Sequence, residues 1–401
     1  MPESADPLVK VEYPRIFLAL DNSFAVKRWT RPKDWLGKVA EIGGISLIEA
    51  NTDVECDPSF STARYLSEWT RQVKEEQVRH GLRVALVHSG HASYRTLGLG
   101  HQDADMRRKI QDEWLNRVIA LGAELGAGVG AYIHAFDDSV LQDPAEYARM
   151  EAVLIDTLAE IVGETQKAGA PFFCLEQMYT PHQTPWTISG AADYLKRTYA
   201  KAGHPLYLTI DTGHQIGQRK FLRPGLREVE SIVERRKNGG SLEGIWLGPD
   251  SAYRIIEEAS GASTGSGVTD RIMAEIDRFP HLFSAPRDGD LYGWFRALGC
   301  YGLNVHLQQT DGRSSSHSPF TDAYNKKGIV EPRKLLEAIR ESFDSAHEEG
   351  LPPPCREIYL TFEIFAGTAE LPNDIIQKLR ESVLYWRRYV PQDGLPLNQL
   401  T

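Results

Sequence analysis

The sequence predicts a (β/α)8 TIM barrel with a long insertion between strands six and seven. Short runs rich in β-branched and aromatic residues alternate with longer stretches of helical period, a rhythm typical of βα units around a parallel sheet. These runs number eight. Four of them end on a carboxylate or a histidine, although a strand buried on both faces is expected to end on an apolar side chain.

The eight expected strands are spread over most of the chain. They are Arg15–Leu20, Ile45–Ala50, Arg83–Val87, Gly130–His134, Phe172–Glu176, Tyr207–Asp211, Leu303–Leu307 and Ile358–Glu363. Between them, apolar residues recur three and four positions apart, as at Met150, Leu154, Leu158 and Ile161, which is the spacing of one buried helix face. Ala170 and Pro171 then end that helix before the next strand.

One interval, from about Gln215 to Leu298, is far longer than a single crossover helix needs. We expect residues 1–401 to form a single barrel domain that carries this segment as an insertion. Two interpretations stay open. The segment is either a surface elaboration with one or two extra helices, or a lid over the barrel mouth or an oligomer contact, since barrels vary most in the loops that follow their strands.

Composition and charge exclude several classes of function. The net charge is −10 and the pI is about 5.7, whereas nucleic acids and anionic membranes call for a basic surface. The N-terminus lacks the features of a signal peptide, and no apolar run reaches the roughly 18 residues of a membrane span. The four cysteines, Cys56, Cys174, Cys300 and Cys355, are widely spaced, and this spacing is typical of reduced thiols in a cytosolic protein. We therefore expect a cytoplasmic protein with no nucleic-acid or membrane partner.

The charged strand ends predict a metal site. Glu176, Asp211 and Glu363 end three of the expected strands and His306 ends a fourth, and in a barrel such ends converge on the face that holds active sites. Three carboxylates repel one another in a low dielectric, and a divalent cation relieves that repulsion. An added imidazole makes a mixed shell that suits Mn²⁺, Co²⁺, Zn²⁺ or Fe²⁺ as well as Mg²⁺.

This order of residues resembles a known family. A glutamate after strand five, Asp-x-x-His (Asp211 to His214) at strand six, a histidine at strand seven and a glutamate at strand eight form the pattern of the xylose isomerase-like barrels. Within them the chain is most similar to the sugar (phosphate) isomerase/epimerase group, which includes the ketose 3-epimerases. The resemblance covers about residues 15 to 390.

The resemblance implies roles for single residues. The four strand-end residues would bind one divalent metal ion. This ion is commonly Mn²⁺, Co²⁺ or Mg²⁺, and Zn²⁺ is compatible with the same ligands. Glu176 and Glu363 would also be the acid/base pair. His214 matches a histidine that helps hold substrate oxygens. Arg313 ends a strand-seven motif whose arginine contacts the substrate. Because barrels of this group often pair, the resemblance also makes a homo-oligomer an expectation.

The implied activity is that of a metal-dependent isomerase or epimerase of a sugar or sugar phosphate. The proton α to a sugar carbonyl is removed by a positioned carboxylate, while the metal stabilises the resulting cis-enediolate. Reprotonation from the opposite face gives an epimer, and return of the proton to the neighbouring carbon gives aldose–ketose isomerisation. The sequence leaves both open.

Further histidines fall at the same end of the expected strands. His88 or His91, after strand three, and His134, at the end of strand four, are expected to hydrogen-bond sugar hydroxyls. The alternative for each is a supporting position behind the site or an exposed position.

Three other functions were weighed. An endonuclease IV-like zinc phosphodiesterase shares the Asp-x-x-His motif, but the net charge of −10 and the lack of an aspartate two residues before His317 argue against it. A metal-assisted lyase or decarboxylase of a keto-sugar acid would use the same chemistry. A non-catalytic sugar-binding barrel would not need both Glu176 and Glu363.

Overall fold

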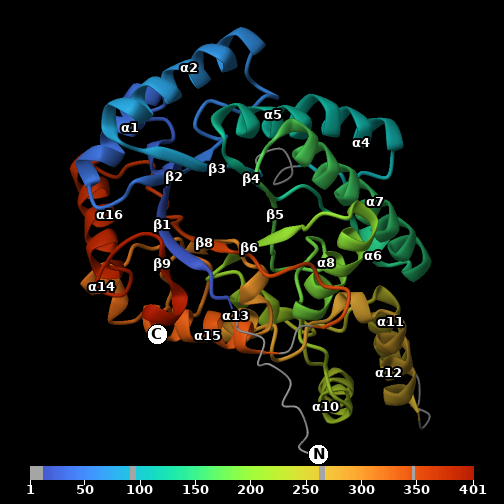
Figure 1. Cartoon of the computed structure of the whole chain (residues 1–401). Coiled ribbons are helices and arrows are strands. Elements are labelled where there is room, and N and C mark those ends of the chain that lie inside the picture. The colour runs from blue at the N-terminus through green and yellow to red at the C-terminus, as the bar shows by residue number, and fades with distance from the viewer. Residues whose placement is uncertain (1–11, 91–95, 262–266, 346–347) are drawn as a thin grey trace, which may run out of the picture.

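The computed structural model describes residues 12–90, 96–261, 267–345 and 348–401. Its eight parallel strands pair in the order β2-β3-β4-β5-β6-β7-β8-β1, and β1 pairs with β2 to close the barrel (Figure 1). This confirms the predicted (β/α)8 fold. A short ninth strand, β9 (Leu395–Pro396), runs antiparallel to the start of β1.

All eight predicted strands are present. They are β1 Arg15–Asp21, β2 Leu47–Asn51, β3 Arg83–Ser89, β4 Gly128–Ala131, β5 Phe173–Glu176, β6 Tyr207–Asp211, β7 Asn304–Leu307 and β8 Glu357–Phe362. The prediction for β4 was wrong by two to three residues, because hydrogen-bonded neighbours on both sides set its register: Gly128 pairs with Leu86, and Ala131 pairs with Leu175. His134 therefore lies beyond the strand instead of ending it.

Helices surround the strands on the outside of the barrel (Figure 1). The longest, α7, begins after Asp143, whose carboxylate accepts the backbone N–H groups of Ala145 and Glu146, and ends at Gly169 with a left-handed φ of 83°. The helices outside the β6–β7 connection are α1 Pro32–Ile42, α2 Ala63–His80, α4 Ala104–Ile110, α5 Asn116–Leu125, α6 Asp138–Leu141, α7 Pro144–Ala168, α8 Ile188–Ala202, α14 Asp322–Asn325, α15 Pro332–Asp344 and α16 Pro372–Trp386. Within the described ranges, every helix is too short or too polar to cross a lipid bilayer.

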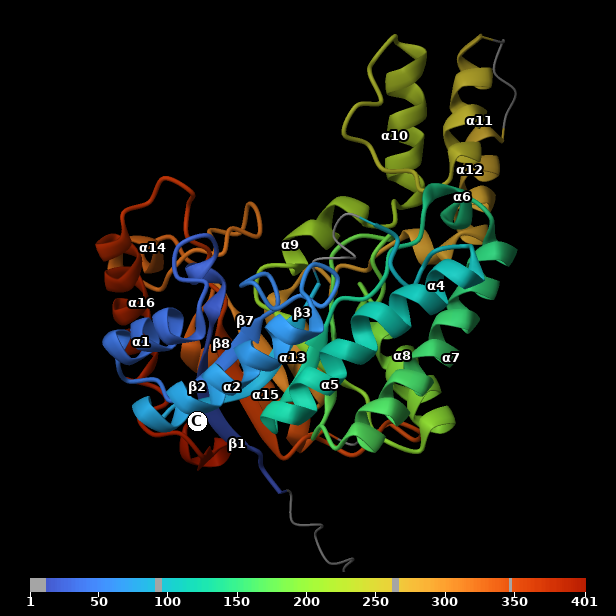
Figure 2. The same ribbon diagram turned by 90° about the horizontal axis from the view of Figure 1, so that it is seen from above.

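The connection between β6 and β7 holds several helices. They are α9 Gln215–Gln218, α10 Leu226–Lys237, α11 Asp250–Gly261, α12 Val268–Arg278 and α13 Leu291–Leu298. α13 packs against α8 and α15 and so completes the helical ring between its neighbours. α10, α11 and α12 pack on one another and project from the barrel body (Figure 2). Whether this projection acts as a lid or as an oligomer contact stays a prediction.

Candidate functional site

The four residues predicted as metal ligands lie at the carboxyl ends of neighbouring strands. Glu176 is the last residue of β5, Asp211 is the last of β6, and Glu363 directly follows β8. His306, in β7, pairs in register with Asp211. All four side chains are buried, so their charges face one another and not bulk water.

The carboxylates of Glu176 and Glu363 both approach one nitrogen of His306. Nδ1 of His306 lies 3.5 Å from Oε1 of Glu176 and 3.3 Å from Oε2 of Glu363. Asp211 belongs to the same cluster through Glu363: one carboxylate oxygen of each and one nitrogen of His317 all lie within 4.8 Å of one another. The structure therefore brings together the set that the sequence predicts.

Asp211 is held by its own turn and by Gln308. Its Oδ1 accepts the backbone N–H groups of Gly213 (2.6 Å) and His214 (3.0 Å). The side-chain amide of Gln308 donates to both carboxylate oxygens, at 2.9 and 3.0 Å. A Cβ at position 213 would come within 2.7 Å of the Gln308 side chain, so the glycine of Asp-Thr-Gly-His makes room for this contact.

Glu49 is a buried member of this cluster that the sequence pattern did not indicate. It lies inside β2, is fully buried, and its Oε1 is 2.9 Å from Nε2 of His306. Its other oxygen accepts the side-chain amide of Asn304 at 2.7 Å. A charged residue inside a buried strand breaks the apolar rule as the strand ends do, so the same criterion applied to strand interiors would have found it.

His317 is the second residue that was missed. It lies in the loop after β7, and its Nδ1 is 3.2 Å from Oε2 of Glu363. Its ring stacks on Phe365 with centroids 3.9 Å apart and planes 11° from parallel. The sequence around His317 bears only on the motif of another enzyme class, because no local pattern indicates where the side chain of a loop residue will point.

Two of the predicted substrate-binding residues line a cavity of about 450 Å³ at this end of the barrel. His88 and His214 are in its wall, together with Tyr179, Ser315, His317, Glu363 and Phe365. Nδ1 of His214 donates to the carbonyl of Gln177 at 2.7 Å. A Cβ on Gly130 would meet the His88 ring at 2.6 Å, so β4 leaves space for this imidazole. His91 lies outside the described residues.

The other two predicted substrate-binding residues are not part of this wall. His134 is fully buried beyond β4, and its Nε2 hydrogen-bonds with Oγ1 of Thr184 at 2.7 Å. Burial lowers the pKa of His134 to about 3, so it is a neutral interior group. The side chain of Arg313 is 89% exposed and lies 3.8 Å from Asp311. Neither residue lines the cavity, and the substrate contacts of both stay a prediction.

The electrostatics keep the two glutamates ionised. Burial by itself raises the pKa of Glu176, but His306 and His88 outweigh it and lower this pKa below its usual value. Burial is likewise outweighed at Glu363, where His306 and His317 hold the pKa well below its ordinary range. Both carboxylates are therefore charged at neutral pH and able to bind a cation or accept a proton.

The donor atoms of the cluster fit a divalent cation. Four buried atoms have no hydrogen-bond partner among the described residues: Nε2 of His88, Nδ1 of His306, Nδ1 of His317 and Oε2 of Glu363. Buried polar atoms are nearly always partnered, so a shared gap at one place indicates a ligand. The separations between these imidazole nitrogens and the oxygens of Glu176 and Glu363 are 3.2 to 3.6 Å, close to the spacing of about 3 Å between ligand atoms around an octahedral ion.

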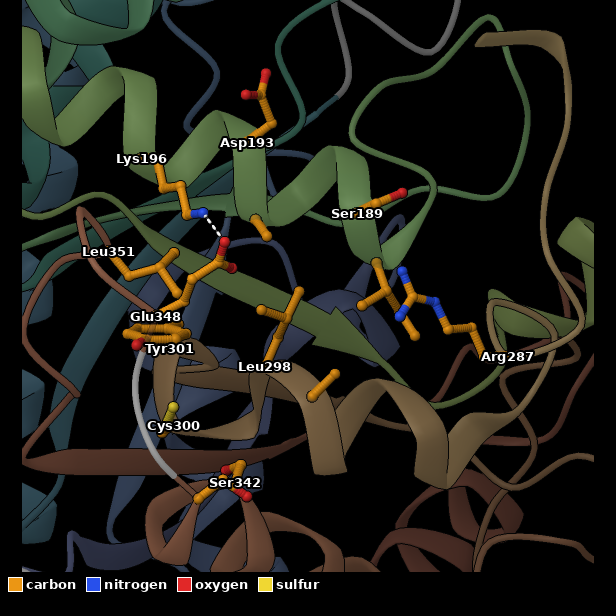
Figure 3. Close-up of a pocket in the computed structure, with 14 residues that line it drawn as sticks. Ser189, Asp193, Lys196, Arg287, Leu298, Cys300, Tyr301, Ser342, Glu348 and Leu351 are labelled. Atoms are coloured by element: carbon orange, nitrogen blue, oxygen red, sulfur yellow. Dashed lines mark ion pairs between the residues drawn. The ribbon is translucent and has the colours of Figure 1, made fainter. Parts of the chain in front are cut away.

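A second cavity, of about 500 Å³, lies outside the barrel between α8, α13 and α15. Figure 3 shows its wall, where Lys196 of α8 forms an ion pair with Glu348, and Tyr301 lies below Glu348 with Cys300 below it. None of the residues predicted for metal or substrate binding contributes to this wall. The candidate site is therefore the cavity at the carboxyl ends of the strands.

The chain shares its fold with xylose isomerase-like and ketose 3-epimerase structures and is similar in sequence to a curated epimerase, so the resemblance indicated by the sequence is confirmed. No protein-family model matches the chain. It is similar to D-erythrulose 1-phosphate 3-epimerase of Brucella abortus, with 23% identity over 378 residues, which are 93% of this chain and 96% of the relative.

Solved structures share the fold. A Rhodospirillum rubrum protein provisionally assigned as a xylose isomerase aligns with a TM-score of 0.64 and 17% identity, covering 93% of this chain and 99% of that one. D-psicose 3-epimerase from Clostridium cellulolyticum, solved with D-tagatose, aligns with a TM-score of 0.54 and 11% identity, covering 93% and 98%. These similarities extend over the whole barrel.

Proposed function

We propose that this chain is a divalent-metal-dependent isomerase or epimerase of a sugar or sugar phosphate. The observation that carries the proposal is the group of unpartnered buried donor atoms of His88, His306, His317 and Glu363 beside two ionised glutamates. Similarity over nearly the full chain to an epimerase of a phosphorylated ketose supports the same class of substrate.

The metal ligands in this proposal are Glu176, Asp211, His306 and Glu363. When bound, the ion would polarise a ketose carbonyl and the adjacent hydroxyl, and so acidify the proton on the carbon that bears this hydroxyl. His306 has a pKa well above its usual value, because Glu363 and Glu49 outweigh the effect of burial. Since ligation requires a deprotonated nitrogen, binding of the ion would release the proton on Nδ1.

Glu176 and Glu363 are the proposed acid/base pair. β5 and β8 are separated in the barrel by β6 and β7, so the two carboxylates come from strands that are not neighbours. One takes the proton α to the carbonyl and leaves an enediolate, and the other returns a proton to the opposite face. His88 and His214, in the cavity wall, are the proposed hydrogen-bonding partners of substrate hydroxyls.

The test is incubation of the Mn²⁺-loaded protein in D₂O with tetruloses, pentuloses, hexuloses and their phosphates, followed by NMR. We expect deuterium at one carbon next to the carbonyl of one substrate class. A new stereoisomer at that carbon identifies an epimerase, and an aldose product identifies an isomerase.

The matched control is the Glu363→Gln protein, which should exchange no proton. Failure of the loaded wild-type protein to exchange deuterium into any of these sugars would contradict the proposal. Loss of carbon dioxide or water from a keto-sugar acid would instead identify the lyase or decarboxylase alternative. Cleavage of a phosphodiester by a three-zinc form would identify the phosphodiesterase alternative.

A further inference from the structure

The loop after β7 carries an imidazole that is aimed into the cluster. His317 has its Nδ1 3.2 Å from Oε2 of Glu363, and its side chain is only 18% exposed. That nitrogen is buried and has no hydrogen-bond partner in the described part of the chain. Phe365, which stacks on the ring at 3.9 Å, fixes the plane of the imidazole. The orientation of this donor is therefore set before any ligand arrives.

The loop is tied to a proposed metal ligand by one side chain. Oε1 of Gln308 accepts the backbone N–H groups of Ser316 (2.9 Å) and His317 (2.7 Å). The amide nitrogen of the same side chain donates to both oxygens of Asp211. His317 also holds a left-handed φ of 45°, which is uncommon for a residue with a Cβ and persists where surrounding contacts impose it. Gln308 thus couples the position of His317 to that of Asp211.

One carboxylate oxygen lies beside both His317 and His306. Nδ1 of His317 and Nδ1 of His306 lie 3.2 and 3.3 Å from one oxygen, Oε2 of Glu363. Asp211, His317 and Glu363 each offer one donor within 4.8 Å of the others. Oε2 of Glu363 is therefore the atom through which both nitrogens could share one ion.

We propose that His317 is a fifth protein ligand, through Nδ1, of the metal ion bound by Glu176, Asp211, His306 and Glu363. This inference rests on the proposed function, because it requires that ion. Two imidazole donors and three carboxylates favour Mn²⁺, Co²⁺ or Zn²⁺ over Mg²⁺, which binds mainly oxygen ligands. The chain should therefore discriminate against Mg²⁺ more strongly than a site with one imidazole.

Pulsed EPR of the full-length protein loaded with Mn²⁺ tests the assignment, because each directly bound imidazole nitrogen couples to the metal electron spin. We expect two coupled ¹⁴N nuclei in the wild-type protein and one in His317→Asn. Asparagine tolerates the left-handed backbone of position 317. The Mn²⁺ affinity, measured from the EPR signal of the free ion, should fall at least tenfold in this variant.

Ser316→Ala is the matched control in the same loop. Its hydroxyl contacts the Gln309 carbonyl and Ser318 and not the imidazole, so both nitrogens should remain. A wild-type spectrum with one coupled nitrogen would overturn the assignment, even if His317→Asn failed to fold. So would a second nitrogen that persists in His317→Asn.

The two proposals fail differently. Mn²⁺ that binds with one nitrogen and is lost in Glu363→Gln would remove only the role of His317. Absence of Mn²⁺ binding, or binding unaffected by Glu363→Gln, would remove the proposed function as well.

Discussion

Glu49 holds the imidazole of His306 from the side opposite the cluster: its Oε1 accepts a hydrogen bond from Nε2 of His306 at 2.9 Å, and both side chains are fully buried. Asn304 donates to the other carboxylate oxygen and accepts the hydroxyl of Thr361, each at 2.7 Å. Burial opposes ionisation of Glu49, but His306 and His88 lower its pKa below the usual value. The Nε2 proton is thereby fixed, and Nδ1 is the nitrogen free to bind a cation.

Replacement of this carboxylate should change the tautomer of His306. In Glu49→Gln, the new side-chain amide has two possible orientations. If its oxygen faces His306, its NH₂ group faces the NH₂ group of Asn304, and two hydrogen-bond donors oppose each other. The reverse orientation donates to Nε2 and moves the imidazole proton to Nδ1. We expect metal affinity to fall roughly 10- to 100-fold, with a changed tautomer visible in the ring ¹⁵N shifts of His306.

A compensating change separates this positioning role from a packing role. In the double variant Glu49→Gln/Asn304→Asp, the amide can donate to Asp and accept from His306, so affinity and tautomer should recover. Glu357→Gln, on β8 and paired with Arg15 near the surface, is the control and should leave both unchanged. Unaltered affinity in Glu49→Gln would contradict the role assigned to Glu49.

Neutralising either proposed acid/base residue should stop turnover. Glu176→Gln and Glu363→Gln keep the shape of each side chain but remove the proton acceptor, so we expect kcat to fall by roughly 10²- to 10⁴-fold or more. Both rates should be measured at saturating Mn²⁺, with bound metal quantified and the fold checked by circular dichroism. Full activity in either variant would rule out the carboxylate pair as the proton-transfer groups.

Removal of the metal should lower both activity and stability. The carboxylates and imidazoles of the cluster are brought together by folding, so an ion bound there stabilises the native state by roughly 2.7 kcal/mol at a free concentration 100 times its Kd. After EDTA treatment and desalting we expect no turnover and a lower Tm, both restored by Mn²⁺ or Co²⁺. Turnover that persists in demonstrably metal-free protein would exclude the proposed chemistry.

The sequence predicts that Glu176, Asp211, His306 and Glu363 lie together because they obey a rule that topology enforces. Parallel strands of a barrel end on one face, so charged ends such as Glu176 and Asp211 must meet. His317 obeys no such rule, since its place depends on the contacts of Gln308 with the loop backbone. His134 was misplaced because pairing with β3 and β5, which local propensity does not reveal, ends β4 at Ala131.

The interior position of His134 has a consequence for acid stability. Burial lowers its pKa from the usual 6.5 to about 3, so between these values the unfolded chain binds a proton that the folded protein does not. The contribution of His134 to the free energy of unfolding is therefore lost as the pH falls below about 6.5, by up to roughly 1.4 kcal/mol per pH unit. Glutamine does not titrate, so the unfolding free energy of wild type minus that of His134→Gln should decrease with this slope in denaturant titrations from pH 6.5 to 4. His204→Gln, at an exposed position, controls for loss of a surface histidine. A difference between wild type and His134→Gln that does not vary with pH would mean that His134 is protonated in the folded protein.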